Sequence, residues 1–151
     1  VSAALEFGIE PIEIREIVYQ AVAYQGAGRQ LKFIPLMNDV FRQHNIELPL
    51  EGTATVAHED RRRAGNELQV EIFGEWYTRK GLSLKDRELV TLCLLTAQGG
   101  CDAQLTAHAK GNMNLGMDRA FLIKVVSQLV PYLGFPRCLN AISCINKAAE
   151  L

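Results

Sequence analysis

The sequence lacks any apolar run as long as the roughly 18 residues that a membrane-spanning helix needs, and it lacks the basic-then-apolar pattern of a signal peptide. Neither charge is in excess, since 16 lysines and arginines stand against 17 aspartates and glutamates. The run Arg61–Arg63 is the one basic cluster, and we interpret it as the solvated start of a helix. Cysteine is scarce, and four cysteines in 151 residues are too few to indicate the disulfide framework of a small secreted protein. We therefore expect a cytoplasmic protein with no membrane partner and no nucleic-acid partner.

Several sequence patterns of catalytic sites are also absent. The chain has no Cys-x-x-Cys, and its three histidines lie far apart, so no zinc-ligand spacing is present. It has no glycine-rich phosphate loop and no Gly-x-Ser-x-Gly nucleophile elbow. No segment alternates apolar and polar residues with the period of two that a half-buried strand shows. The sequence predicts an all-α fold without a metal site.

Apolar residues recur with helical spacing along most of the chain. Ser83 followed by Asp86 is a capping-box signature, and Asp118 is a further N-cap candidate. Pro35 either kinks the second predicted helix or marks its true start. The expected helices cover residues 10–24, 29–44, 60–77, 84–98 and 101–114, with one more after Asp118 and a last one after Gly134.

The beginning of the chain is similar to its end. When residues 1–43 are placed on residues 109–151, ten positions are identical, among them Gly26/Gly134 and Asn38/Asn146. Chance would give about two or three identities, so we predict a duplicated unit whose first copy is truncated at its N-terminus. The predicted organisation is 1–44 for the second half of the first repeat, 45–57 for a linker and 58–151 for a complete repeat. Residues 122–130 are apolar or small almost all round, which predicts an oligomer.

Polar residues that could carry chemistry gather between positions 87 and 108. Cys101, Gln104 and His108 are spaced so that they share one helix face. A short turn would make helices 84–98 and 101–114 antiparallel, with Glu88 and His108 at similar distances from the turn. A histidine beside a carboxylate is an acid/base pair with a held tautomer, although a core histidine satisfied by a carboxylate gives the same pattern.

Three further residues have two interpretations each. Cys101 lies at a predicted helix start, which favours a thiolate, or it is a small buried residue, as we expect for the other cysteines. The repeated Tyr-x-Gly-x-x-Arg, here Tyr132 and Arg137, either packs over a helix break or offers an arginine to a substrate carboxylate. We favour the structural interpretation of this motif because both copies carry it.

Taken in order along the chain, these elements closely resemble the carboxymuconolactone decarboxylase family, which shares its fold with alkyl hydroperoxidase D. The resemblance rests on Arg61, Gly65, Phe73-Gly74, the run Leu84-Lys85-Asp86-Arg87-Glu88-Leu89, Gly99-Gly100-Cys101, His108, Gly116 and Tyr132-x-Gly-Phe-Pro-Arg137. It implies an all-helical bundle assembled into homotrimers or hexamers. It also implies decarboxylation of a carboxylated lactone or a related small acid, with no cofactor.

The resemblance implies roles for individual residues. His108 would be the general acid/base, Glu88 its orienting partner, and Arg87 or Arg137 the carboxylate anchor. From the sequence itself we add Gln104 and Tyr132 as further substrate-binding candidates. The hydroperoxidase branch instead implies a Cys-x-x-Cys four residues before the histidine. Here Cys101 fills the first cysteine position and Gln104 the second. A thiol-dependent peroxidase that uses Cys101 is therefore the alternative enzyme, and a non-catalytic assembly subunit is the third hypothesis.

Overall fold

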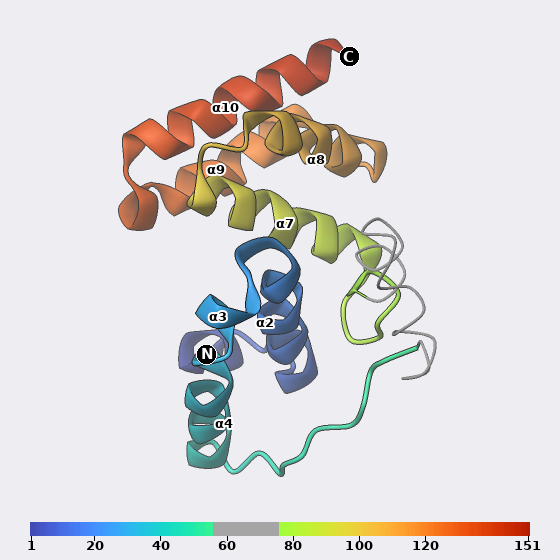
Figure 1. Ribbon diagram of the computed structural model, residues 1–151, viewed down its shortest axis with the longest axis vertical. Helices are drawn as coiled ribbons and strands as arrows, with labels where there is room; N and C mark the ends of the chain where they lie inside the picture. Colours follow the sequence, from blue (N-terminus) through green and yellow to red (C-terminus); the bar gives the residue numbers. More distant parts are fainter. Residues whose placement is uncertain (56–75) are drawn as a thin grey trace. The chain divides into compact units, whose positions relative to one another are not determined.

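The computed structural model describes residues 1–55 and 76–151, and within these ranges it contains helices and no strand (Figure 1). The all-α prediction is confirmed for this part of the chain. The predicted helix 60–77 lies outside the described residues except for its last two positions. The helices are α1 (Ser2–Glu6), α2 (Pro11–Gln25), α3 (Ala27–Gln30), α4 (Phe33–Gln43), α7 (Leu84–Gln98), α8 (Asp102–Asn114), α9 (Arg119–Leu133) and α10 (Phe135–Glu150). None of the described helices is both long enough and apolar enough to cross a membrane.

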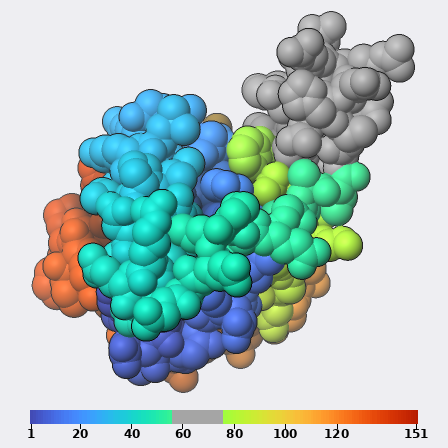
Figure 2. Space-filling view, turned by 90° about the horizontal axis from the view of Figure 1, so that it is seen from below, coloured from blue at the N-terminus to red at the C-terminus, as the bar shows by residue number. Residues whose placement is uncertain are grey.

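The chain divides into two compact units, Val1–Arg87 and Glu88–Leu151, and the division falls within α7. Residues 46–55, in the predicted linker, contain no helix. The space-filling view shows this segment continuing from α4 on one face of the molecule (Figure 2). The sequence-based boundaries at 44 and 57 remain predictions.

In the first unit, α2 packs against α3 and α4. A capping box starts α2, because the backbone N–H of Glu10 donates to Oε2 of Glu13 at 3.0 Å, and Pro11 occupies the first turn. Phe41 and Met37 from α4 and Ile14 from α2 form the buried core.

The predicted helix 29–44 is two helices, α3 and α4, which are separated at residues 31–32. Pro35 is the third residue of α4. The first four N–H groups of a helix have no partner within it, so a proline in this turn breaks no hydrogen bond. Of the two interpretations of Pro35, a marker of the true helix start is the correct one.

In the second unit, α10 packs against α8 and α9, which lie beside it in Figure 1. Gly99 and Gly100 connect α7 to α8 with φ of 69° and 70°, a conformation that other residues rarely adopt. Asp118 caps α9 as predicted, since it accepts a hydrogen bond from the N–H of Phe121 at 2.7 Å. The buried apolar residues of this unit are Leu92, Leu95, Leu105, Ala109, Met117, Leu122, Val126, Cys138, Ala141, Cys144, Ile145 and Ala148.

Helix ends in the two similar segments coincide. Helix α9 begins and ends 108 positions after α2, which is the same offset that aligns the two sequence segments. Each helix is followed by a glycine with positive φ, Gly26 after α2 and Gly134 after α9. After this glycine the segments differ, because α10 is continuous whereas its counterpart is divided into α3 and α4.

Candidate active site

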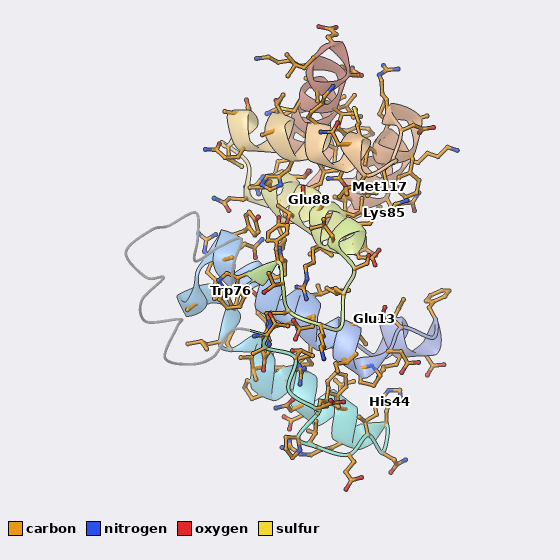
Figure 3. The ribbon with its side chains drawn as sticks, turned by 90° about the vertical axis from the view of Figure 1, so that its right-hand side faces the viewer. Glu13, His44, Trp76, Lys85, Glu88 and Met117 are labelled. Carbon is orange, nitrogen blue, oxygen red and sulfur yellow. The ribbon has the colours of Figure 1, made fainter. Side chains whose placement is uncertain are left out.

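Glu88 and His108 form a hydrogen-bonded pair between α7 and α8. Nδ1 of His108 lies 2.8 Å from Oε2 of Glu88. The side chain of His108 is 17% exposed and that of Glu88 is 11% exposed. Figure 3 labels Glu88 on α7. The sequence-based expectation that the two residues face each other is therefore confirmed. A carboxylate in this position holds the Nδ1–H tautomer and orients the imidazole ring.

Asn112 ties the two helices of the pair together. It is fully buried, and its Nδ2 donates to the backbone carbonyl of Glu88 at 3.0 Å and to that of His108 at 2.7 Å. Its Oδ1 is buried without a hydrogen-bond partner among the described residues. The sequence analysis missed Asn112, although its place four residues after His108 puts it on the same helix face.

Gly111 makes room for the carboxylate of Glu88. A Cβ atom built at position 111 would lie 2.9 Å from Oε2 and 3.6 Å from Cδ of Glu88. Glycine in the middle of a helix costs about 1 kcal/mol relative to alanine, so its place in α8 calls for a packing reason. The sequence analysis missed this residue too, and its only signal was a glycine inside a predicted helix.

Of the two interpretations of Cys101, its surroundings favour the packing residue over the thiolate. Cys101 is the N-cap residue of α8, and its Sγ lies 3.5 Å from the carbonyl oxygen of Leu95. Burial, the negative charge of Asp102 and the neighbouring Cys144 raise the pKa of Cys101.

The other cysteines behave as packing residues. Cys138 and Cys144 are buried, as predicted. Cys93 is half-buried, and burial raises its pKa to about 11. All four cysteines are free thiols.

The remaining substrate-binding candidates of the second unit are accessible. Gln104 is exposed on α8 and Arg137 is exposed on α10. A Cβ at Gly99 would lie 3.6 Å from Nε of Arg137, so this guanidinium extends along the turn between α7 and α8. Tyr132 is 83% exposed, so it does not pack over the helix break as the structural interpretation required.

Arg87, predicted as a carboxylate anchor, is instead buried within the first unit. Its Nη2 donates to Oε2 of Glu16 at 3.2 Å and to the carbonyl of Arg79 at 2.8 Å, and its Nη1 donates to Oε1 of Gln20 at 3.2 Å. The side chain has no exposed surface. Because Glu16, Gln20 and the carbonyl of Arg79 already accept hydrogen bonds from this guanidinium, we leave Arg87 out of the candidate site.

Glu16 is the centre of that buried cluster. Burial would raise the pKa of Glu16, but hydrogen bonds from Arg79, Thr53 and Arg87, together with the charge of Arg79, lower it below its ordinary value. Arg15 also approaches this carboxylate, at 3.5 Å. One carboxylate thus binds three guanidinium groups, which stabilises the ionised form. The sequence analysis did not identify this cluster.

Within the part of the chain that the structure describes, no group of three or more His, Cys, Asp or Glu side chains is placed to hold a metal ion. The chemistry that this geometry can supply is proton transfer at the Glu88–His108 pair.

Comparison with known proteins identifies the class. Residues 69–147, slightly more than half of the chain, match the carboxymuconolactone decarboxylase family, and the chain belongs to that family. It is also similar to the nitrosuccinic acid decarboxylase npaB of Metarhizium robertsii, with 33% identity over 86 residues. The aligned part covers 56% of this chain and 59% of the relative, so the chain spans about three fifths of that protein.

Proposed function

We propose that this protein is a carboxy-lyase that removes CO₂ from a small carboxylated acid by acid/base catalysis. The observation that carries the proposal is the 2.8 Å contact between Nδ1 of His108 and Oε2 of Glu88. The family match and the decarboxylase activity named for the Metarhizium robertsii relative agree with it. We expect the substrate to be a carboxylated lactone or a related acid.

The pair suits the proton step of a decarboxylation. When the bond between the substrate carbon and its carboxylate breaks, CO₂ leaves and the bonding electron pair stays on the substrate, so an electron-withdrawing group must accept it. In the proposed step, Nε2 of the His108 imidazolium then donates a proton to that carbon. Glu88 orients the imidazolium during the transfer, and a proton from water restores it afterwards.

Arg137 and Gln104 are the proposed substrate-binding residues. A guanidinium binds a carboxylate through two parallel hydrogen bonds, and Arg137 has an exposed guanidinium beside the α7–α8 turn. Gln104 offers an exposed amide one turn before His108. Tyr132, which is 83% exposed, is a third candidate.

We also propose that the subunit forms a homotrimer or hexamer, in the cytoplasm. Three large apolar side chains on α9 and α10, Phe121, Phe135 and Leu139, are 43%, 67% and 57% exposed, and a subunit interface would cover them. Four free thiols fit a reducing compartment. The sequence similarity of 1–43 to 109–151 and the matching ends of α2 and α9 support a duplicated unit.

The thiol-peroxidase alternative has less support. A peroxidatic cysteine needs thiolate character, whereas burial and Asp102 raise the pKa of Cys101. We therefore rank it second.

CO₂ release from nitrosuccinate and from a carboxylated muconolactone, with each product identified by mass, tests the proposed function. The wild-type protein should turn over at least one of these acids, and Glu88→Gln should lower kcat by about 10² to 10⁴, the range for general acid–base catalysis. Glu13→Gln, a change to a glutamate of the first unit, is the matched control. Equal rates for Glu88→Gln and the wild type would contradict the proposal.

A further inference from the structure

A cavity of about 440 Å³ lies entirely within the first unit, between α2, α4 and residues 48–50. Its polar lining comes from Arg15, Tyr19, Asn38 and Arg42, and its apolar lining includes Met37 and Leu48. Cavities of about 300–1,000 Å³ with apolar walls and a few polar groups are typical of small-molecule sites. None of these residues belongs to the Glu88–His108 site.

Arg15 supplies a fixed positive charge at this cavity. It is 8% exposed, and its guanidinium is held by hydrogen bonds from Nη1 to the carbonyl of Leu50 at 3.2 Å and from Nη2 to Oγ1 of Thr53 at 3.0 Å. Its Nε is buried without a hydrogen-bond partner among the described residues. The nearest carboxylate, Glu16, also binds Arg79 and Arg87, so it offsets only part of the charge of Arg15.

Arg42 adds a second, adjustable positive charge. Its Nη1 lies 2.7 Å from Oδ1 of Asp39, but both side chains are more than half exposed, at 63% and 60%. An exposed pair of this kind contributes only about 0.2–1 kcal/mol, so a ligand can recruit the guanidinium at small cost. Asn38, four residues earlier on α4, adds an amide that can donate a hydrogen bond.

We propose that this cavity binds a small organic monocarboxylate with an apolar body. The carboxylate is bound by Arg42 and Asn38 within the field of Arg15, and the apolar body packs against Ile34 and Leu48, next to the buried Met37. Buried apolar area gives the affinity, and the two arginines select for the negative charge. This inference does not depend on the proposed decarboxylase activity.

Methionine methyl groups provide a direct test. The chain has three methionines, of which Met37 lines this cavity while Met113 and Met117 belong to the second unit. In protein labelled with ¹³C at the methionine methyls, hexanoate should shift the Met37 signal saturably, with a Kd on the order of 1 mM. The neutral isostere hexanamide should bind at least about tenfold more weakly. Met37→Leu assigns the signal.

Two exposed substitutions and one control distinguish the charge effect from simple apolar binding. Arg42→Gln should weaken hexanoate binding about fivefold, and Asp39→Asn, which releases Arg42 and removes a competing carboxylate, should strengthen it. Arg29→Gln removes an exposed arginine of the same unit that does not line the cavity, and it should leave binding unchanged. The proposal is overturned if the Met37 signal does not respond, if hexanamide binds as well as hexanoate, or if Arg42→Gln has no effect.

Discussion

Gly111 faces the carboxylate of Glu88 so closely that a Cβ atom at position 111 would lie 2.9 Å from Oε2. That oxygen is the one that contacts Nδ1 of His108. The absence of a side chain in α8 therefore sets the position of the catalytic pair proposed for this protein.

Gly111→Ala should separate activity from stability. The displaced group is the end of a flexible side chain, so the fold can accommodate the methyl by moving Glu88, and alanine favours the helix by about 1 kcal/mol. We expect the melting temperature to stay the same or rise while kcat falls about 10- to 100-fold, because the hydrogen bond to His108 is disturbed. Thermal unfolding and CO₂ release measure the two effects.

Gly28→Ala is the matched control for this substitution. Gly28 also lies in a helix, α3, and a Cβ there would meet nothing within 4 Å. It should leave kcat unchanged. A loss of activity in Gly28→Ala equal to that in Gly111→Ala would show that the effect is not specific to Glu88.

Asn112→Ala should destabilise the second unit. The substitution removes the amide that donates to the backbone carbonyls of Glu88 and His108, and it leaves a cavity in a fully buried position. The expected loss is about 1–3 kcal/mol of the free energy of unfolding. Urea unfolding, followed by circular dichroism, measures it. Unchanged stability would mean that Asn112 does not hold the two helices together.

Glu16 should make stability depend on acid pH. Because its pKa is lower in the folded state, it contributes stability above its unfolded-state pKa of about 4.5, and this stability is lost as the pH falls through the lower folded-state value. Glu16→Gln should remove this contribution and, by leaving Arg87 buried without its carboxylate, cost about 3–5 kcal/mol at pH 7. Urea unfolding at several pH values measures both effects. If the stabilities of the wild type and Glu16→Gln fell in parallel over this acid range, the account of Glu16 would be wrong.

Cys101 should react slowly with oxidants near neutral pH. Its raised pKa leaves little thiolate, which is the reactive form. Intact mass after a brief, substoichiometric dose of an organic hydroperoxide should therefore show no change in the wild type or in Cys101→Ser. A gain of one oxygen, or a loss of two hydrogens, in the wild type alone would move the thiol-peroxidase alternative to first place.

The sequence was sufficient to predict that Glu88 and His108 face each other. Helical periodicity and the Gly99-Gly100 turn make α7 and α8 antiparallel, and equal distances from the turn then bring Glu88 and His108 together. These are local regularities, which a single sequence carries directly.

Other features that depend on how the helices pack were not predicted. Nothing near Arg87 in the sequence indicates that its guanidinium donates a hydrogen bond to Glu16, which lies 71 positions away. The room that Gly111 leaves for Glu88 is equally a contact between helices. Burial is the main cause of the raised pKa of Cys101, and burial depends on the tertiary structure.

The most direct test of the account is to compare CO₂ release by His108→Gln and His44→Gln on an acid that the wild type decarboxylates. His44 is exposed and follows α4 in the first unit, so its substitution controls for the loss of a histidine (Figure 3). We predict that His108→Gln lowers kcat by at least about 10² with its helical content intact, and that His44→Gln keeps the wild-type rate. A His108→Gln protein that releases CO₂ as fast as His44→Gln would contradict the central claim.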